Sequence, residues 1–294
     1  MNTAEEKNQN VRRYNQHFII DNSVLDDLVL NSGIEIDETV LEIGPGDGSI
    51  TEKLVEYAEK VIAIESDIGL KQSLERLKVK YDNLEIIYAN ALNVRFPKFD
   101  RIVSNIPFNI TEPLLNKLFG ENFKSGTVIF GARYAEEATK EHPSTRMGIL
   151  TRSYFEVECI KEVPSYCFEP EPSTDASIIT LNPIKKLELL SSFKKYIVRC
   201  IWDQKTRPLE YALSAAFAQY QSSKGNKNSD SYQFINEIAK NYNHDLNTRT
   251  ERISNPEFLD LYEILGNIKL KKIFGGHKPR GGAKNWRIEF KEYL

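Results

Sequence analysis

VLEIGPGDGSIT, residues 40–51, joins a short apolar run to a stretch in which every second residue is glycine. This order of residue types predicts a β-strand, a sharp turn and the start of a helix. Gly44, Gly46 and Gly48 let the backbone bend tightly and leave no Cβ in the path of a ligand lying over the end of the strand. We therefore expect this loop to hold a nucleotide-like ligand.

The spacing of these glycines separates two classes of nucleotide-binding protein. The dinucleotide fingerprint G-x-G-x-x-G needs glycine at position 49, where this chain has Ser49. The pattern here is G-x-G-x-G, and Glu42 precedes it. NAD is therefore the poorer fit. The pattern resembles the first motif of class I methyltransferases, in which the glycines pass beneath the methionine part of S-adenosylmethionine.

An acidic residue follows the glycines at the distance that a ribose contact requires. Glu65 ends the next apolar run and lies 21 residues after Gly44. A carboxylate at the end of the second strand can accept hydrogen bonds from both ribose hydroxyl groups. Each feature alone is more often plain structure, but the pair in this order indicates cofactor binding.

Short β-rich runs alternate with helical segments from residue 39 onward. This alternation predicts an α/β fold of the Rossmann-like class I methyltransferase type, with a mostly parallel sheet covered by helices on both faces. The strands expected in it are TVLEI (39–43), KVIAI (60–64), LEIIY (84–88), FDRIVS (99–104) and GTVIF (126–130). Two further β-type stretches, 153–163 and 173–181, are expected to add antiparallel strands at one edge.

The character of the sequence changes after residue 183. Apolar residues at helical spacing in 186–202 and 208–220 predict helices. We therefore expect a cofactor-binding catalytic domain over residues 1–183 and a smaller, helical, basic RNA-binding domain over 184–294. Residues 221–231 have almost no apolar content and are expected to form an exposed loop. The Lys- and Arg-rich segment 269–290 can lie along a phosphate backbone or be a surface tail.

The bulk composition excludes several classes of protein. No apolar run approaches the ~20 residues of a membrane span, and the N-terminus lacks the apolar core of a secretory signal. Cys159, Cys167 and Cys200 are the only cysteines and lack CxxC spacing, so neither a disulfide framework nor a metal site is expected. We expect a cytoplasmic monomer that does not contact a membrane.

The net charge of −3 hides an asymmetry between the two parts of the chain. Residues 185–294 hold 20 Lys and Arg against 12 Asp and Glu, a net charge of +8, which leaves −11 on residues 1–184. The C-terminal part is therefore the expected contact for a polyanion, although ordinary solvated surface charge would give the same count.

SNIPFNIT, residues 104–111, follows the fourth strand at the sheet edge where ligands of open α/β sheets bind. The N6 amino group of adenine is a weak nucleophile, because its lone pair is delocalised into the ring. Hydrogen-bond acceptors favour a pyramidal nitrogen and the positive charge that develops on it during methyl transfer. The Asn105 side-chain oxygen and the Ile106 carbonyl can be these acceptors. Pro107 fixes the turn, and Phe108 offers a flat face for the base.

Polar residues outside these motifs complete the expected cofactor site. Asn90 follows the third strand, where its amide can hydrogen-bond the adenine of the cofactor. Gln16 and His17, in NQHFIIDNSV (15–24), precede the first strand and can close over the cofactor. Taken alone, Asn90 can equally be a turn residue, and His17 would more often be a residue leading into a helix.

NQHFII, LEIGPGDGSIT, Glu65, NIPFNIT and FEPEPSTDASIITL (168–181) together resemble the rRNA adenine N6-dimethyltransferase family. This family includes the KsgA-type small-subunit enzymes and the Erm methyltransferases of large-subunit rRNA, and the resemblance covers residues 12–183 in the right order. It implies transfer of two methyl groups from S-adenosylmethionine to one adenine. The implied partner is ribosomal RNA or a pre-ribosomal small subunit.

The resemblance also implies a role for each matching residue. The implied cofactor contacts are His17, Ile19, Gly44, Glu65, Asn90 and Asn105. The implied base-handling residues are Asn105, Ile106, Pro107 and Phe108. Phe168, in the F-x-P-x-P loop, would stack on the target base or wall it from the other side.

Three departures from the family pattern leave the substrate open. Asn90 replaces the usual Asp, GARYAEE (131–137) stands where a Q-K-E-type stretch is commoner, and QKTRPLEYAL (204–213) keeps only Lys205 and Thr206 of a basic helix start. Small-subunit rRNA is the first expectation. The alternatives are Erm-type methylation of large-subunit rRNA, DNA adenine methylation, and a non-catalytic ribosome-assembly or transcription factor on the same fold.

Overall fold

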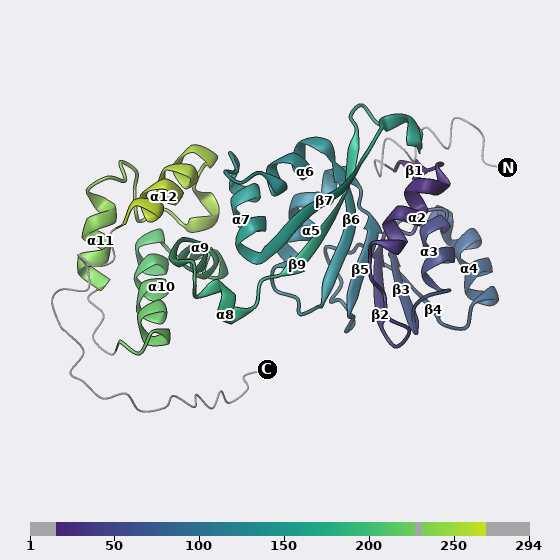
Figure 1. Cartoon of the computed structure of the whole chain (residues 1–294), viewed down its shortest axis with the longest axis horizontal. Helices are drawn as coiled ribbons and strands as arrows, with labels where there is room; N and C mark the ends of the chain where they lie inside the picture. The colour runs from purple at the N-terminus through teal and green to yellow at the C-terminus, as the bar shows by residue number, and fades with distance from the viewer. Residues whose placement is uncertain (1–15, 227–230, 269–294) are drawn as a thin grey trace.

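The computed structural model describes residues 16–226 and 231–268. At its centre is a seven-stranded sheet with the strand order β4–β3–β2–β5–β6–β9–β7 (Figure 1). The strands from β4 to β6 run parallel, whereas β9 is antiparallel to both β6 and β7. The strands are β2 (Thr39–Ile43), β3 (Lys60–Glu65), β4 (Leu84–Tyr88), β5 (Arg101–Asn105), β6 (Ser125–Gly131), β7 (Phe155–Val163) and β9 (Ala176–Pro183). The mostly parallel sheet with an antiparallel edge, expected from the sequence, is confirmed.

Both faces of this sheet are apolar, because successive side chains of a strand point to opposite faces and both sets are hydrophobic. Val40 belongs to the buried cluster on one face, and its neighbour Leu41 belongs to the cluster on the other. The first cluster includes residues of α2 (Asn22–Leu30), α3 (Ser49–Leu54) and α4 (Lys71–Lys80). The second includes residues of α5 (Thr111–Leu118), α6 (Ala132–Thr139) and α7 (Arg146–Tyr154). Helices therefore cover both faces, as a parallel sheet requires.

The strand expected over 153–163 begins later than predicted, because its first two residues belong to α7. Thr145 caps this helix by accepting a hydrogen bond from the Gly148 amide at 3.1 Å. Tyr154, the last residue of α7, is buried with its ring stacked on Phe119 at a centroid distance of 4.2 Å. The buried ring contact of Tyr154 thus belongs to the end of a helix, where alternation alone predicted a strand.

The chain after β9 is helical, as expected. Its helices are α8 (Lys186–Leu189), α9 (Phe193–Asp203), α10 (Leu209–Ser223), α11 (Ser231–Ala239) and α12 (Asn255–Asn267). The single helix expected over 186–202 is interrupted, because Ser192 caps a new helix. The loop expected over 221–231 is wrong at both ends, since α10 continues to Ser223 and α11 starts at Ser231. Residues 227–230 and the segment 269–290 lie outside the described residues.

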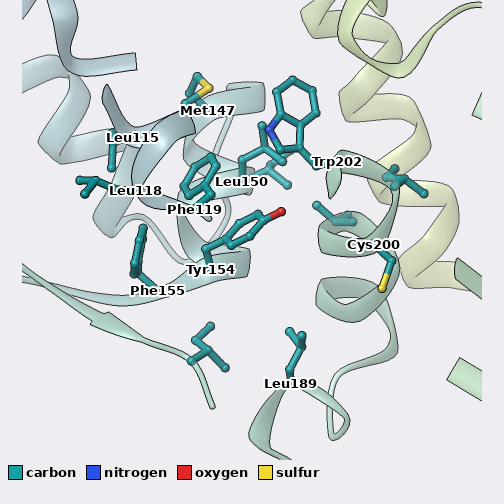
Figure 2. Close-up of a cluster of buried hydrophobic side chains, with 14 of the residues drawn as sticks. Leu115, Leu118, Phe119, Met147, Leu150, Tyr154, Phe155, Leu189, Cys200 and Trp202 are labelled. Atoms are coloured by element: carbon teal, nitrogen blue, oxygen red, sulfur yellow. The ribbon is translucent and has the colours of Figure 1, made fainter. Parts of the chain in front are cut away.

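The C-terminal helices share a hydrophobic cluster with the helices on the sheet (Figure 2). Phe119 and Tyr154 lie on the sheet side of this cluster, and Trp202 of α9 lies on the other. Trp202 Nε1 donates a hydrogen bond to Asn116 Oδ1 at 3.0 Å. Arg146 Nη1 donates to the Ile253 carbonyl at 2.7 Å. Apolar packing and specific hydrogen bonds therefore join the two parts of the chain.

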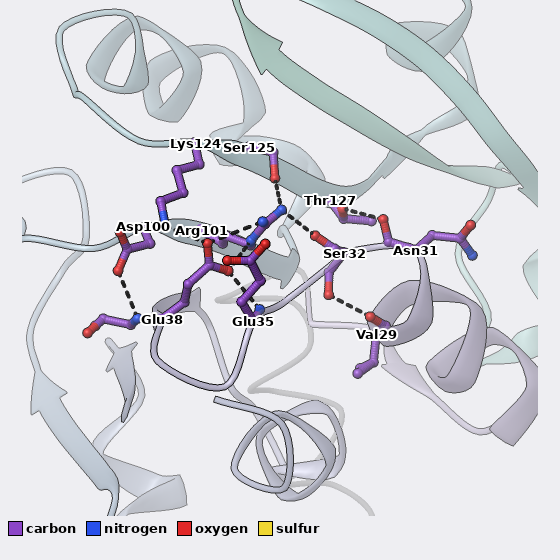
Figure 3. Close-up of polar contacts among 11 residues, drawn as sticks. Val29, Asn31, Ser32, Glu35, Glu38, Asp100, Arg101, Lys124, Ser125 and Thr127 are labelled. Atoms are coloured by element: carbon purple, nitrogen blue, oxygen red, sulfur yellow. Dashed lines mark hydrogen bonds and ion pairs between the residues drawn. The ribbon is translucent and has the colours of Figure 1, made fainter. Parts of the chain in front are cut away.

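A buried polar network lies at the start of β5 (Figure 3). The Arg101 guanidinium donates to the Glu38 carboxylate, to the Ser32 carbonyl at 2.9 Å and to Ser125 Oγ at 2.7 Å. Lys124 Nζ donates to Glu38 Oε1 at 2.7 Å. Burial of Glu38 raises its pKa, but the hydrogen bonds from Arg101 and Lys124 outweigh burial and lower the pKa to about 2. The network ties the loop before β2 to β5 and β6.

Residues 16–226 and 231–268 contain neither a membrane-spanning helix nor a cluster of metal ligands. Each helix in these ranges is too short or too polar to cross a lipid bilayer. No cluster of three or more His, Cys, Asp or Glu side chains in these ranges is placed to bind a metal ion.

Candidate active site

The sheet opens at the carboxyl ends of β2 and β5, where the chain order reverses. Strands β3 and β4 extend the sheet on one side of β2, and β5 and β6 extend it on the other. Such a reversal leaves a crevice in which ligands of open α/β sheets bind. Backbone pairing of β2 with β5 covers only Val40 with Arg101 and Leu41 with Ile102. Further along, the Ile43 amide donates instead to Ser104 Oγ at 2.7 Å.

A cavity of about 350 Å³ occupies this crevice. Its walls come from four segments: the N-terminal residues before α2, the glycine loop, the ends of β3 and β4, and the turn after β5. The sequence-predicted residues that line it are Gln16, His17, Ile19, Gly44, Gly46, Glu65, Asn90, Asn105, Ile106, Pro107 and Phe108. The fold thus brings segments that are far apart in the sequence to one cavity.

The glycine loop requires residues without a side chain at positions 44 and 46. Gly44 and Gly46 have φ of +71° and +61°, in the left-handed region that favours glycine. A Cβ at Gly46 would lie 2.9 Å from the Phe18 ring, and a Cβ at Gly44 would lie 3.6 Å from the Pro107 ring. Phe18 was not predicted as a site residue, although its segment was. At these two positions the loop presents backbone without a side chain to the cavity.

Glu65 ends β3 at the cavity wall and is 2% exposed. Burial raises the pKa of this carboxyl. Its oxygens accept hydrogen bonds from the Gly46 amide at 3.2 Å and the Asp67 amide at 2.7 Å. These two amides fix the carboxylate, and the remaining lone pairs can accept from ribose hydroxyl groups. Glu65 therefore fits the ribose of S-adenosylmethionine, and the neighbouring glycine loop fits its methionine part.

A second carboxyl, Glu42, lies under the glycine loop and is fully buried. Burial raises its pKa to about 8, although Thr51 Oγ1 donates a hydrogen bond to it at 2.6 Å. The other oxygen of Glu42 has no hydrogen-bond partner in the described part of the chain. The sequence marked Glu42 as part of the motif but did not indicate that it is held as a neutral acid.

The turn after β5 orients the Asn105 side chain. Asn105 Nδ2 donates to the His17 carbonyl at 2.8 Å, which leaves Oδ1 as the atom able to accept a hydrogen bond from a ligand. The Ile106 amide donates to the Ile129 carbonyl at 3.3 Å and anchors the turn to β6. The Phe108 ring covers Gly131, where an added Cβ would lie 3.5 Å from it.

The N-terminal segment is held against the F-x-P-x-P loop. Strand β1 (Phe18–Ile19) pairs antiparallel with β8 (Phe168–Glu169). His17 Nδ1 lies 2.6 Å from the Pro170 carbonyl, so this ring nitrogen is the donor. The His17 and Phe108 rings lie 6.0 Å apart at an angle of 29°. These contacts place the segment over one side of the cavity.

Phe168 is the predicted site residue that the structure does not bring to the cavity. Its side chain is 2% exposed and belongs to the buried cluster around α2. Its backbone pairs with Ile19, which does line the cavity. The ring is directed into the core because it fills space beneath the β1–β8 pair. Phe168 therefore packs beside Ile19 in the described part of the chain, and its expected contact with a target base stays a prediction.

Asn90 begins an exposed turn after β4. Its Oδ1 accepts a hydrogen bond from the Leu92 amide at 2.9 Å, so Nδ2 is the atom free to meet a ligand. The usual Asp would present only acceptors at this point. Asn90 in place of the usual Asp thus offers a ligand a donor instead of an acceptor. It still accepts the Leu92 amide hydrogen bond that caps the turn.

A parallel sheet with a glycine-lined cavity at the carboxyl ends of its strands, and an acidic residue at the end of the second parallel strand, defines a class I methyltransferase. The model of the family described as "Ribosomal RNA adenine dimethylase" matches residues 7–247 of the chain. The protein therefore belongs to this family and is an S-adenosylmethionine-dependent rRNA adenine N6-dimethyltransferase.

Curated relatives agree with this assignment. The "Ribosomal RNA small subunit methyltransferase A" of Clostridium acetobutylicum is 35% identical over 187 residues, which cover 60% of this chain and 67% of the relative. The "Probable ribosomal RNA small subunit methyltransferase A" of Methanosarcina acetivorans is 28% identical over 261 residues, or 87% of this chain and 94% of the relative.

Solved structures agree on the fold. A dimethyladenosine transferase from Plasmodium falciparum superposes with a TM-score of 0.58 and 24% identity, covering 85% of this chain and 98% of that one. The 23S rRNA methyltransferase ErmE superposes with a TM-score of 0.55 and 20% identity, covering 85% of this chain and 100% of that one. Both superpositions include the C-terminal helices, since 85% of the chain extends beyond β9.

Proposed function

We propose that this enzyme dimethylates adenine in small-subunit ribosomal RNA. The names of the relatives from Clostridium acetobutylicum and Methanosarcina acetivorans support this substrate, at 35% and 28% identity. Erm-type methylation of large-subunit rRNA is the second candidate, favoured by the structural similarity to ErmE at 20% identity. The observation that carries the proposed chemistry is the juxtaposition of the glycine loop and the Asn105 turn in one cavity.

In the proposed reaction, the Asn105 turn prepares the N6 amino group. Asn105 Oδ1 and the Ile106 carbonyl accept hydrogen bonds from the two N6 hydrogens and stabilise the positive charge that develops on nitrogen. Pro107 fixes the path of the turn, and Phe108 stacks on the base. When bound, S-adenosylmethionine supplies an electrophilic methyl group on its sulfonium. In the first transfer, the bond from N6 to the methyl carbon would form as the carbon–sulfur bond breaks, leaving S-adenosylhomocysteine, and one N6 proton would pass to water. The monomethylated adenine keeps one N6 hydrogen, so a second transfer would use one of the two acceptors and a fresh S-adenosylmethionine.

The other side of the cavity is proposed to hold the cofactor. Gly44 and Gly46 pass beneath its methionine part, and Glu65 accepts hydrogen bonds from its ribose. Asn90 faces its adenine. The remaining proposed contacts come from the N-terminal segment and are Gln16, His17 and Ile19. Glu65 is buried, so its hydrogen bonds to the ribose would be stronger than those made by the exposed Asn90.

The C-terminal part is proposed to hold RNA, with a division of function at residue 183, where β9 ends. Its net charge of +8 is unevenly spread: residues 185–268 hold 12 basic and 10 acidic side chains, whereas 269–294 hold 8 and 2. The phosphate contacts are therefore assigned chiefly to residues 269–294. We propose a monomer acting in the cytoplasm: the cavity lining described above is compatible with a monomer, and a ribosomal RNA substrate supports this compartment.

The test is methyl transfer from labelled S-adenosylmethionine to purified 30S-type subunits and to naked large-subunit RNA, each prepared without prior adenine methylation. We expect label in the 30S-type subunits, recovered as dimethyladenosine after digestion. Label confined to the large-subunit RNA would establish the Erm-type alternative. Absence of label from both substrates, with cofactor binding intact, would contradict catalysis and support a binding role.

A further inference from the structure

Asn90 provides the hydrogen-bond acceptors that close the turn at residues 90–94. Its side-chain oxygen accepts from the Leu92 amide at 2.9 Å, and its backbone carbonyl accepts from the Asn93 amide at 2.9 Å and the Val94 amide at 3.2 Å. The amides of the turn are therefore used internally. Its carbonyls need donors from elsewhere, because a carbonyl removed from water is costly without a partner.

Lys117 supplies those donors. Its Nζ donates to the Ala91 carbonyl at 2.6 Å and also to the Val94 carbonyl. The ammonium lies 3.7 Å from the centre of the Phe96 ring, a position that favours a cation. Lys117 is half-buried, and burial lowers its pKa. One side chain thus clamps both ends of the segment from residue 91 to residue 94.

Lys117 connects the two halves of the cavity through one short helix. Ala91 lines the cavity on the side of Asn90, and Ile110 lines it on the side of the Asn105 turn. The helix α5 starts at Thr111, directly after that turn, and Lys117 lies in its last turn. Its residues Leu114 and Leu118 are fully buried, so the helix is fixed on the sheet.

We propose that Lys117 is a positioning residue for cofactor recognition: through α5 it sets the turn that holds Asn90 against the adenine of S-adenosylmethionine. The proposal rests on the placement of that adenine beside Asn90 under the proposed function. Lys117 does not line the cavity, so its effect on the cofactor is transmitted by the Ala91 and Val94 carbonyls.

The test compares Lys117→Met with Lys117→Arg and Lys80→Met in the full chain. Methionine keeps the apolar stem of the side chain and removes the ammonium, whereas arginine retains two-carbonyl donation. Lys80 is a matched control, because its Nζ also lies over an aromatic ring, that of Tyr81 at 4.7 Å, but pairs with Glu52 on the surface. The measurements are the Kd of S-adenosylmethionine by calorimetry, KM for each substrate, kcat and Tm.

We expect Lys117→Met to raise the Kd and KM of S-adenosylmethionine roughly tenfold, the loss expected for charge-assisted hydrogen bonds that order a binding turn. The kcat and the KM for RNA should change less than twofold. Lys117→Arg should restore most of the affinity, and Lys80→Met should leave it unchanged. A lowered Tm with unchanged cofactor Kd would make Lys117 merely structural and overturn the proposal.

Asn90→Ala separates failure of this proposal from failure of the proposed function. If Asn90→Ala weakens cofactor binding but Lys117→Met does not, the adenine lies beside Asn90 and the positioning role of Lys117 is wrong. If neither variant changes the Kd, the adenine does not lie beside Asn90, and both the placement and the positioning role are wrong.

Discussion

The two ends of strand β5 differ in how their polar side chains are paired. Charged side chains at its start bind one another, whereas the Asn105 amide at its end keeps an oxygen available for a ligand. At its start, the Arg101 guanidinium has Glu38, Ser32 and Ser125 as partners, and Lys124 completes the pairing of Glu38. At its end, Asn105 uses its nitrogen on the His17 carbonyl and keeps its oxygen toward the cavity. The two ends lie only four residues apart.

The contrast separates stability from function within one strand. Where every donor and acceptor is satisfied internally, removal of one partner leaves the others buried and unpaired, so the fold is affected. Where one atom is left for a ligand, its removal affects binding or chemistry and leaves the fold intact. Each of the following changes tests one side of this division.

Arg101→Leu is expected to have the largest effect on stability. It leaves the Glu38 carboxylate, 1% exposed, without its main partner, which costs about 3–5 kcal/mol of unfolding free energy. Urea denaturation would measure the loss. Lys60→Met is the control, because the Lys60–Glu85 pair is exposed, at 45% and 44%, and is worth at most about 1 kcal/mol. Equal losses in the two variants would contradict a structural role for the network.

Asn105→Ala is expected to lower kcat at least about 100-fold, the typical loss when one preorganised group that stabilises transition-state charge is removed. Urea denaturation should show a change of unfolding free energy below that of Arg101→Leu, and the Kd of S-adenosylmethionine should change less than the kcat. Single-turnover methylation with saturating RNA and cofactor measures the chemical step. A kcat within tenfold of the unchanged enzyme would remove Asn105 from the reaction.

The buried carboxyl of Glu42 is expected to make the stability of the fold depend on pH. Burial raises its pKa to about 8, whereas an unfolded chain has the ordinary value of 4.5. The folded protein therefore holds a proton that the unfolded chain releases, so stability is full below about pH 4.5 and is lost as the pH rises toward 8. Glu42→Gln should flatten this decline, which is at most about 1.4 kcal/mol per pH unit. Parallel pH profiles of the two proteins between these limits would show that Glu42 does not titrate with folding.

Ser104→Ala is expected to have the smallest effect. It leaves the Ile43 amide unpaired where the backbone ladder between β2 and β5 has ended, at a cost of about 1–3 kcal/mol. Because Ile43 precedes the glycine loop and Ser104 precedes Asn105, kcat should fall severalfold. Ser153→Ala is the matched control: this serine is equally buried, but its hydroxyl donates within its own helix. Identical kcat in both variants would show that Ser104 only supports the fold.

The features that were predictable from the sequence depend on local chemistry. Glycine at 44 and 46 is required by the backbone conformation of the loop itself, and Glu65 follows at the spacing that a parallel strand pair imposes. Asn105 ends a strand and Pro107 follows it closely, so their place at the sheet edge follows from the topology. These residues could be assigned to a cavity because short segments determine them.

The features that were missed depend on partners from distant segments. Lys117 looks like an exposed helix lysine until the fold places the Ala91 carbonyl beside it. Ser104 looks like a spacer until β2 separates from β5. Phe168 was expected at the base because its loop resembles a family motif, but the β1–β8 pair buries its ring. Tertiary packing decides each of these cases, and no local pattern records it.

The pairing of β1 with β8 has a consequence for ligand exchange. These strands form a two-stranded sheet of their own, separate from the seven-stranded one. The His17 bond to Pro170 and the Ile20 amide bond to Cys167 join its two segments, the Asn105 bond to the His17 carbonyl ties it to β5, and Ile19 and Phe168 are buried in the cluster around α2. A cofactor that left through this side of the cavity would have to break these bonds and expose Ile19 and Phe168 to water, which disfavours exchange by that route.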